Sequence, residues 1–248
     1  MENGKIKIVG IGPGNISEMT PKARLAIETA EVIAGYNTYI KLIPQLVSGK
    51  KIIGTAMMQE VERCKMAIDE AAIGKDVALI SSGDAGIYGM AGLIIDMILN
   101  LPENERPQFE VIAGISAVNA AAAILGAPLM HDFAVISLSD LLTDWELIKK
   151  RVECAAAGDF VIALYNPKSH KRVKNILEVQ EILLRYKNKN TPVGIVTNAV
   201  RLNEQKIIST LENFTDEEIN MFSLVLIGNS QTYVKAGFMI TPRGYDLI

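Results

Sequence analysis

The residues that could bind or transform a small molecule lie in short glycine-rich stretches. The first reads GIGPG, from Gly10 to Gly14; the second reads SSGDAGIYGMAG, from Ser81 to Gly92; the third reads AGISA, from Ala113 to Ala117. Each follows an apolar run, and glycines at the end of a strand let a ligand approach the backbone. Each stretch alone also fits a simple turn into a helix. Their shared position predicts a ligand site at one edge of an open α/β sheet.

The first loop does not have the spacing of a dinucleotide site. Such a site needs a third glycine three residues after the second, at the start of a helix, and an acidic residue about twenty positions further on. Here the glycines run G-x-G-x-G, and the helix is predicted to begin only at Pro21, with Thr20 as its N-cap. The next candidate strand, Val32 to Ala34, ends without an acid. A nicotinamide or flavin site is therefore disfavoured, and a tight structural turn remains open.

Two later stretches place an asparagine at the end of a predicted strand. They read LYNPKSHKR, from Leu164 to Arg172, and IVTNAV, from Ile195 to Val200. Asparagine is a common turn residue, so a structural and a binding role remain equally open. The first stretch opens a local basic cluster made of Lys168, His170, Lys171, Arg172 and Lys174. This cluster is either a solvated helix start or a contact for an anionic substrate.

Zinc and hydrolase chemistry are disfavoured. The chain has two histidines and two cysteines, which are too far apart in sequence for a zinc motif. The segment SSGDAG is not the G-x-S-x-G pattern of a serine hydrolase, and neither His131 nor His170 has a neighbouring motif that marks it as a base. We expect no metal site.

The composition is that of a globular protein of the cytoplasm. The 248 residues suffice for two domains of about 120 residues each, or for one large α/β domain. The net charge of -3 provides no general attraction for nucleic acid. Cys64 and Cys154 both fall in predicted helices, which suits a reducing compartment, and the N-terminus lacks the apolar core of a signal peptide.

One uncharged run tests the expectation that no membrane is involved. Residues Val111 to Met130 are as long as a membrane span, but Gly114 and Asn119 interrupt the first half and Pro128 ends the second. We therefore interpret the run as a strand, a turn and a buried helix.

Apolar runs typical of strands alternate with helical patterns along the first half of the chain, which predicts a mainly parallel sheet covered by helices. Later runs such as Lys206 to Ser209 have little helix between them, which predicts a second sheet with antiparallel pairs. We place a boundary near Pro128, giving domains 1–127 and 128–248. The predicted strands are 6–9, 51–53, 77–81, 109–112, 133–138, 160–164, 193–196 and 222–227.

The ordered set of motifs resembles the tetrapyrrole methylases. GIGPG occurs widely in that family, whereas SSGDAGIYGMAG together with DFAVISLSDLL, from Asp132 to Leu142, and IGNSQTY, from Ile227 to Tyr233, is similar to its C17-methyltransferases of cobalamin biosynthesis. The likeness spans essentially the whole chain. It implies two α/β domains with mixed, mainly parallel sheets and a ligand cleft between them. It also implies a homodimer that takes S-adenosylmethionine as methyl donor, releases S-adenosylhomocysteine and acts on an anionic tetrapyrrole.

The resemblance also implies which residues contact each ligand. The methyl donor is expected at Pro13, Gly83, Asp84, Ile87, Ser116, Ala117, Asn166 and Ala199. The macrocycle is expected at Gly12, Gly14, Tyr88, Lys168 and Arg172. The resemblance also implies departures from the family pattern at Asp144, where proline is frequent, at Thr197, where arginine is frequent, and at His170, which sits in a position that is more often basic.

The implied reaction is methyl transfer to C17 of the macrocycle with contraction of the ring. Methyl transfer mainly requires alignment of donor and acceptor, which can supply roughly 7–11 kcal/mol of the barrier reduction. Ring contraction moves protons, and Asp84, Tyr88 and His170 are the candidate acids and bases. Two alternatives remain: another methyltransferase of the same fold, and a tetrapyrrole-binding module without turnover.

Overall fold

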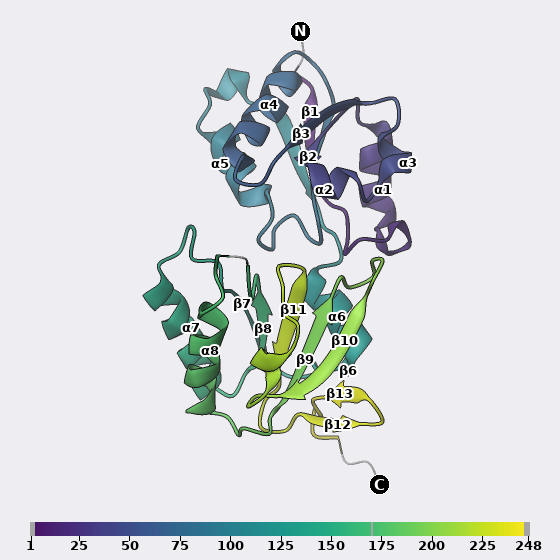
Figure 1. The fold of residues 1–248 in the computed structure, drawn as a ribbon. Coiled ribbons are helices and arrows are strands. Elements are labelled where there is room, and N and C mark those ends of the chain that lie inside the picture. The colour runs from purple at the N-terminus through teal and green to yellow at the C-terminus, as the bar shows by residue number, and fades with distance from the viewer. Residues whose placement is uncertain (1–2, 170, 246–248) are drawn as a thin grey trace. The chain divides into compact units, whose positions relative to one another are not determined.

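The computed structural model describes residues 3–169 and 171–245 and divides the chain into two compact units, Met1–Ala117 and Val118–Ile248. Each unit has its own five-stranded sheet (Figure 1). This confirms the predicted α/β class with two sheets. Within the described ranges, no helix combines the length and the apolar character that crossing a bilayer requires.

The sheet of the first unit is entirely parallel. Its strand order is β3-β2-β4-β1-β5, so β1 lies between β4 and β5. All five residues of β4 are buried, as expected for a parallel strand covered on both faces. The strands are β1 (Lys5–Gly10), β2 (Val32–Tyr36), β3 (Lys51–Thr55), β4 (Val77–Ser81) and β5 (Gln108–Ile112).

Helices cover both faces of this sheet. Ile6 and Ile8 of β1 pack in one apolar core with residues of α4 and α5, whereas Val9 packs in a second core with residues of α1 and α3. This alternation follows from the period of two along a strand. The helical segments are η1 (Ile16–Glu18), α1 (Pro21–Thr29), α2 (Asn37–Ile40), α3 (Pro44–Val47), α4 (Glu60–Ala72), α5 (Ala91–Leu99) and η2 (Glu103–Glu105).

The start of α1 confirms the sequence prediction. Thr20 is the N-cap, its Oγ1 accepts a hydrogen bond from the Ala23 N–H at 3.2 Å, and Pro21 is the first helical residue. The cap satisfies one of the N–H groups that a helix leaves unpaired at its start. The helix therefore begins seven positions after Gly14, and its N-terminus does not follow directly on the first glycine loop.

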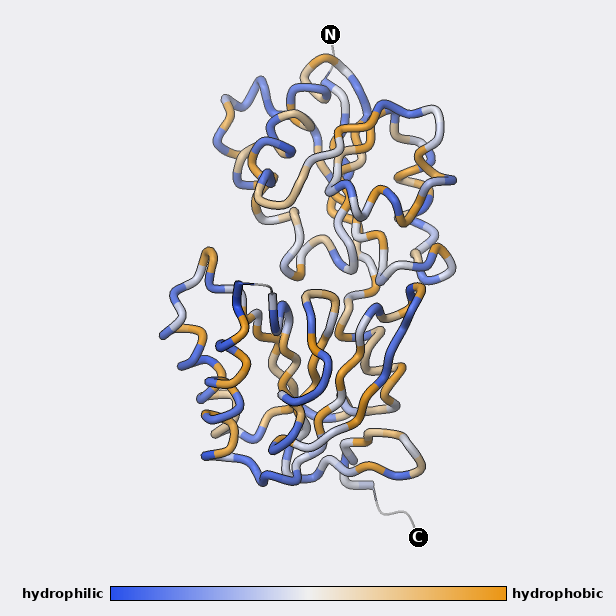
Figure 2. The backbone as a smooth tube through the Cα atoms, in the orientation of Figure 1, coloured by the Kyte–Doolittle hydropathy of each residue, from blue (hydrophilic) through white to orange (hydrophobic). Residues whose placement is uncertain are grey.

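The sheet of the second unit is mixed. Its order is β10-β9-β11-β8-β7; β7 and β8 pair in parallel, and the other three pairs are antiparallel. The predicted antiparallel pairing is thus confirmed. The tube in Figure 2 is mainly hydrophobic along β8, β9 and β11, is hydrophilic over part of β10, and alternates in hydropathy along α7 and α8. The sheet consists of β7 (Phe133–Ser137), β8 (Val161–Tyr165), β9 (Pro192–Thr197), β10 (Gln205–Thr210) and β11 (Ser223–Ile227).

The remaining elements of the second unit surround this sheet. Residues of α7 and α8 pack in one apolar core with β8, β9 and β11, and Phe214 is fully buried in that core. A separate small sheet has the order β12-β13-β6. These elements are α6 (Ala117–Leu125), β6 (Gly126–Ala127), α7 (Trp145–Ala157), α8 (Asn175–Leu184), η3 (Phe214–Asp216), β12 (Tyr233–Lys235) and β13 (Phe238–Ile240).

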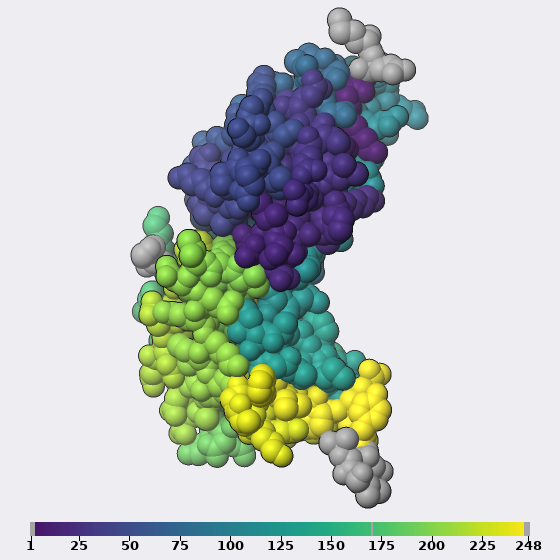
Figure 3. All heavy atoms as spheres, turned by 90° about the vertical axis from the view of Figure 1, so that its right-hand side faces the viewer, coloured from purple at the N-terminus to yellow at the C-terminus, as the bar shows by residue number. Residues whose placement is uncertain are grey.

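Residues 118–127, which the sequence analysis assigns to the first domain, group by their contacts with the second unit. Gly126 and Ala127 pair with β13, and the Lys206 ammonium donates to the Ile124 carbonyl at 3.1 Å. Figure 3 shows the yellow C-terminal segment against the teal segment of α6 and β6. Gly126 and Pro128 suggest a break, but Gly126 adopts a φ of +131° and continues into a paired strand.

Candidate functional site

The three glycine-rich loops of the first unit leave neighbouring strands at the same edge. They follow β1, β4 and β5, which are adjacent and parallel, so their carboxyl ends lie together. Gly12 and Gly83 exchange two backbone hydrogen bonds: Gly12 N–H donates to Gly83 O at 3.1 Å and Gly83 N–H to Gly12 O at 2.7 Å. The predicted loops are therefore brought together by their own backbones.

Gly10 is required where these loops meet, a role that sequence reasoning missed. A Cβ atom at this position would lie 2.6 Å from the Gly83 carbonyl oxygen and 2.7 Å from the Gly114 nitrogen. Real Cβ atoms do not approach backbone that closely, so any side chain here would push the loops apart. The only sequence signal was a glycine at the last position of an apolar run.

Asp84 joins two of the loops with its side chain. Its Oδ1 accepts from the Gly86 N–H at 2.8 Å and its Oδ2 accepts from the Gly114 N–H at 3.0 Å. The first bond shapes the β4 loop, and the second ties that loop to the loop after β5. Each carboxylate oxygen keeps a further lone pair, so Asp84 can still accept a hydrogen bond from a ligand.

Ile87 and Tyr88 project from the outer part of the β4 loop. Tyr88 is 55% exposed and adopts a φ of +53°, a backbone conformation that costs a bulky residue about 1–2 kcal/mol. Such strain in an exposed aromatic residue is typical of functional loops. The far end of the loop is fixed, because Met90 N–H donates to the buried Ser81 hydroxyl at 3.2 Å.

The other predicted donor residues of this unit lie at the same edge. Pro13 is buried beside the Gly12–Gly83 pair, Ser116 is buried in the loop after β5, and Ala117 is half-buried at the first position of α6. Gly14 is half-buried, with a φ of +155°.

A second set of predicted residues lies in the second unit, after β8 and β9. These strands run in the same direction, because both are antiparallel to β11. Asn166 has a φ of +49°, and its amide donates to the Ser137 hydroxyl at 3.0 Å. Ala199 lies between Asn198, at φ +54°, and Val200, at φ +60°, an unusual conformation for a β-branched residue. His170 lies outside the described residues.

Arg172 is engaged within the protein. Its Nη1 donates to the Leu138 carbonyl at 2.5 Å, and its Nε lies 3.8 Å from Oδ1 of Asp140. The side chain is only 11% exposed. Arg172 therefore ties the loop after β8 to the loop after β7, whereas Lys168 is half-buried and makes no ion pair with any residue in 3–169 or 171–245.

Two of the residues that are expected to depart from the family pattern make hydrogen bonds to their neighbours. Asp144 is the N-cap of α7, and its Oδ1 accepts from the N–H groups of Glu146 and Leu147. Thr197 is buried, and its hydroxyl lies 2.7 Å from the Ser223 hydroxyl. The side chains of both residues therefore hydrogen-bond to neighbours within the second unit.

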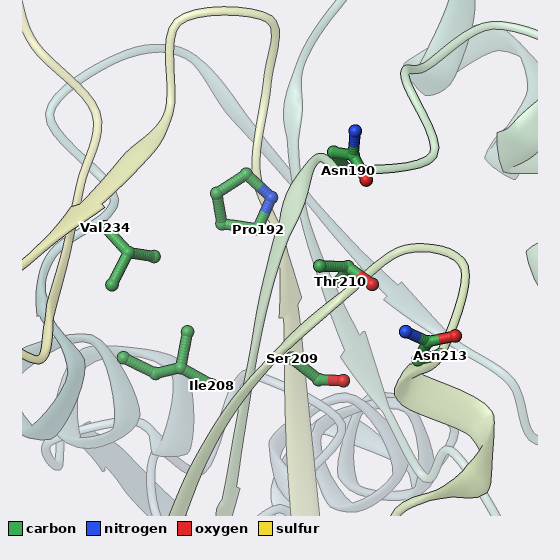
Figure 4. Close-up of a pocket in the computed structure, with 7 residues that line it drawn as sticks. All are labelled: Asn190, Pro192, Ile208, Ser209, Thr210, Asn213 and Val234. Carbon is green, nitrogen blue, oxygen red and sulfur yellow. The ribbon is translucent and has the colours of Figure 1, made fainter.

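A hollow of about 420 Å³ lies elsewhere in the second unit. Figure 4 shows Val234 and Ile208 on one side of it and polar side chains on the other. It includes Pro192, which begins β9, whereas Ala199 follows the opposite end of that strand. The hollow therefore contains none of the predicted ligand residues.

Similarity to known proteins extends over the residues described above. The profile of a family described as Tetrapyrrole (Corrin/Porphyrin) Methylases matches residues 5–215, which include both sets of loops. The chain belongs to the tetrapyrrole methylase family. The resemblance seen in the sequence motifs is thereby confirmed. Enzymes of the tetrapyrrole methylase family are methyltransferases that use S-adenosylmethionine as the methyl donor.

Individual relatives of this tetrapyrrole methylase are similar over its whole length. A "Probable cobalt-factor III C(17)-methyltransferase" of Salmonella typhimurium is 47% identical over 98% of this chain and 100% of the relative. A "Cobalt-factor III methyltransferase" of Priestia megaterium is 48% identical over 98% of this chain, but the chain spans only 45% of that longer protein.

Solved structures share the fold. The crystal structure of the methyltransferase CobJ superposes with a TM-score of 0.91 and 34% identity, covering 96% of this chain and 100% of that one. A uroporphyrin-III C-methyltransferase of Thermus thermophilus, complexed with S-adenosylhomocysteine, gives 0.70 at 19% identity over 91% of this chain and 97% of that one, and this likeness shows the fold alone.

The loops of the first unit fit a donor of this kind. Gly12 and Gly83, which pair with each other, have no side chains, and their φ values of +80° and +68° are ones that glycine adopts without strain. A ligand can therefore approach the backbone closely. The Asp84 carboxylate lies directly beside this pair and can accept from an ammonium or hydroxyl group, both of which S-adenosylmethionine carries.

Proposed function

We propose that this tetrapyrrole methylase transfers the methyl group of S-adenosylmethionine to C17 of cobalt-factor III during cobalamin biosynthesis, and that ring contraction accompanies the transfer. The observation that carries the proposal is the 47% identity with the Salmonella protein over 98% of this chain and 100% of that protein. The likeness to CobJ at 34% identity, again over nearly the whole of both chains, supports the same subgroup.

The donor supplies an electrophilic methyl group, and the protein's task is to hold it in line with the acceptor carbon. In the first unit, the Gly12–Gly83 pair, the Asp84 carboxylate and the Gly10 contact fix three loops to one another. Fixed positioning of two reactants can lower the activation barrier by roughly 7–11 kcal/mol. We propose that these loops bind the donor, through Pro13, Gly83, Asp84, Ile87, Ser116 and Ala117.

The remaining assignments stay predictions. Asn166 and Ala199 are proposed as further donor contacts, and Gly12, Gly14, Tyr88 and Lys168 as macrocycle contacts. Arg172, which was also predicted to contact the macrocycle, is bound to the loop after β7, and its role is taken up below. For the proton transfers of ring contraction, Tyr88, which is 55% exposed as a residue, is favoured over Asp84, because both oxygens of Asp84 already accept backbone hydrogen bonds. His170 remains a candidate.

We also propose a homodimer in the cytoplasm. Both cysteines of the chain are free thiols, and Cys64 is buried, which raises the pKa of its thiol to about 12. Free thiols suit a reducing compartment. Light scattering coupled to size-exclusion chromatography measures the mass of the assembly directly.

The experiment that tests the function is incubation of the enzyme with isotopically labelled donor and a panel of acceptors. The panel contains cobalt-factor III, the cobalt-free precorrin-3B and uroporphyrinogen III. We expect label in the cobalt-factor III product above all. Transfer to uroporphyrinogen alone would point to a different methyltransferase of this fold, and binding of donor without any labelled product would point to a binding module.

A further inference from the structure

The loop between β7 and α7, residues 138–144, displays two adjacent leucines. Leu141 is 70% exposed and Leu142 is 100% exposed. Figure 2 shows a hydrophobic tip on this loop, beside a hydrophilic stretch after β8. Isolated exposed leucines need no explanation, but two in sequence at one loop tip leave a substantial apolar area in water.

The loop is held at several points along its length. Leu138 N–H donates to the Tyr165 carbonyl at 2.9 Å, and Ser139 N–H donates to the Ser137 hydroxyl at 3.2 Å. Arg172 binds the Leu138 carbonyl and pairs with Asp140, while Asp144 caps α7. The leucines are therefore presented on a support that is ordered before any ligand arrives, which lowers the entropic cost of binding.

The segment that Arg172 ties to this loop is mainly positive. Lys171 and Lys174 are exposed, and Lys168 is half-buried, all on the segment that Arg172 ties to this loop. Both carboxylates of the loop are committed, Asp140 to Arg172 and Asp144 to the helix start. Among residues 3–169 and 171–245, Lys168, Lys171 and Lys174 form no ion pair. An apolar tip on a loop that is tied to this lysine-bearing segment suits a flat apolar ligand with carboxylates at its rim.

We infer that Leu141 and Leu142 contact the face of the tetrapyrrole macrocycle, that the neighbouring lysines meet its carboxylates, and that Arg172 is a positioning residue for this loop. This inference rests on the proposed function and assigns part of its substrate contact. The two leucines then contact the face of the ring and the lysines its carboxylates, whereas Arg172 itself does not touch the ligand.

The test is binding of a stable carboxylated tetrapyrrole, uroporphyrin III, followed by quenching of Trp145, the only tryptophan of the chain. We compare the wild type with the double variant Leu141→Ser/Leu142→Ser. The matched control is Leu25→Ser on α1, which removes a leucine that is 59% exposed in the other unit. We expect the Kd for uroporphyrin to rise tenfold or more in the double variant only, with S-adenosylhomocysteine affinity unchanged in all three proteins.

Arg172→Gln separates positioning from direct contact. If Arg172 acts by holding the loop, its loss weakens uroporphyrin binding by a similar factor at low and high salt. A direct contact between Arg172 and a ligand carboxylate would instead give a defect that shrinks as salt screens the charge. That second result would overturn the positioning role.

Other outcomes would overturn the leucine contact. Unchanged uroporphyrin affinity in the double variant would do so while leaving the proposed function intact. So would binding of the wild type to vesicles of phosphatidylserine, lost in the double variant, with uroporphyrin affinity unaffected; the leucines would then face a lipid surface. Failure of the wild type to bind uroporphyrin or cobalt-factor III at all would overturn the proposed function itself.

Discussion

Asp84 was expected to act on the ligand, and its setting adds a second role within the protein. A hydrogen bond to a charged group contributes about 1.5–3 kcal/mol, and Asp84 makes two such bonds to the N–H groups of Gly86 and Gly114. These bonds order the loops where the donor is proposed to bind. Loss of Asp84 should therefore weaken donor binding even if the carboxylate never touches the donor.

We predict that Asp84→Ala raises the Kd for S-adenosylhomocysteine roughly tenfold or more, measured by calorimetry, since at least one bond of about 1.5 kcal/mol is lost from the ordered site. Asp69→Ala, which removes an exposed carboxylate of α4, is the matched control and should bind normally. Unchanged binding combined with lost turnover would contradict this and assign Asp84 to the chemical step.

Asp159 links three segments at the amino edge of the second sheet. It lies before β8 with a φ of +55°, its Oδ1 is 3.2 Å from the Lys187 ammonium, and its carboxylate accepts from the hydroxyl and N–H of Ser230. Burial alone would raise the pKa of Asp159, but the bonds from Ser230 and the Lys187 charge outweigh it and lower that pKa below the usual 3.8. Burial, in turn, lowers the pKa of Lys187 despite this pairing.

A carboxylate whose pKa is lowered by folding stabilises the protein above its unfolded pKa, and that stability is lost as the pH falls through the folded value. We predict that Asp159→Asn lowers the free energy of unfolding by about 1–2 kcal/mol near neutral pH, a modest value because the side chain is 45% exposed. Asparagine tolerates the positive φ, so the backbone is retained.

Urea unfolding followed by Trp145 fluorescence measures this difference, since Trp145 packs against the core of the second unit. The difference between wild type and variant should shrink as the pH falls below 3.8. A difference that is constant down to the lowest accessible pH would show that the charge of Asp159 is not its source.

At the scale of elements, strands with buried apolar runs could be predicted from the sequence almost to the residue. The run Val77–Ser81 is fully buried and forms β4 with the predicted limits. The small sheet was missed, because β12 is three exposed residues without alternation and β6 is only Gly126–Ala127. Its pairing partners lie far apart in sequence, and no local pattern marks them.

The loops of the candidate site were predictable and their internal bonds were not. Glycines after apolar runs mark the loops, but Asp84 binds a nitrogen 30 positions away and Arg172 binds a carbonyl 34 positions away. Gly10 shows the same limit. No side chain fits at this position, but the reason appears only once β1, β4 and β5 are paired and their loops meet.

The N-cap of α7 gives a prediction at the same scale. Asp144 accepts from two N–H groups at the start of the helix, and its φ is -55°. Asp144→Ala should lower the free energy of unfolding by about 1 kcal/mol, the usual contribution of a cap. Asp144→Pro introduces the residue that the sequence analysis expects at this position in the family; proline fits this φ without strain and should not cost more than alanine. A much larger loss for proline, again by urea unfolding, would contradict the observed backbone.

At the scale of the whole molecule, the chain matches full-length methyltransferases along nearly all of its residues, and each of its two units ends several strands in loops that carry candidate ligand residues. Extensive agreement of sequence and fold favours a working enzyme of this subgroup over a module that only binds. Asp144 and Thr197, two of the expected departures from the family pattern, each make hydrogen bonds within the second unit and therefore fit this fold.

The most direct test of the central claim is the position of the transferred carbon. The enzyme is incubated with cobalt-factor III and donor labelled with ¹³C in its methyl group, and the product is analysed by NMR. We predict a single labelled methyl on C17 of a contracted ring. A label on any other carbon, or recovery of unlabelled macrocycle, would contradict the account.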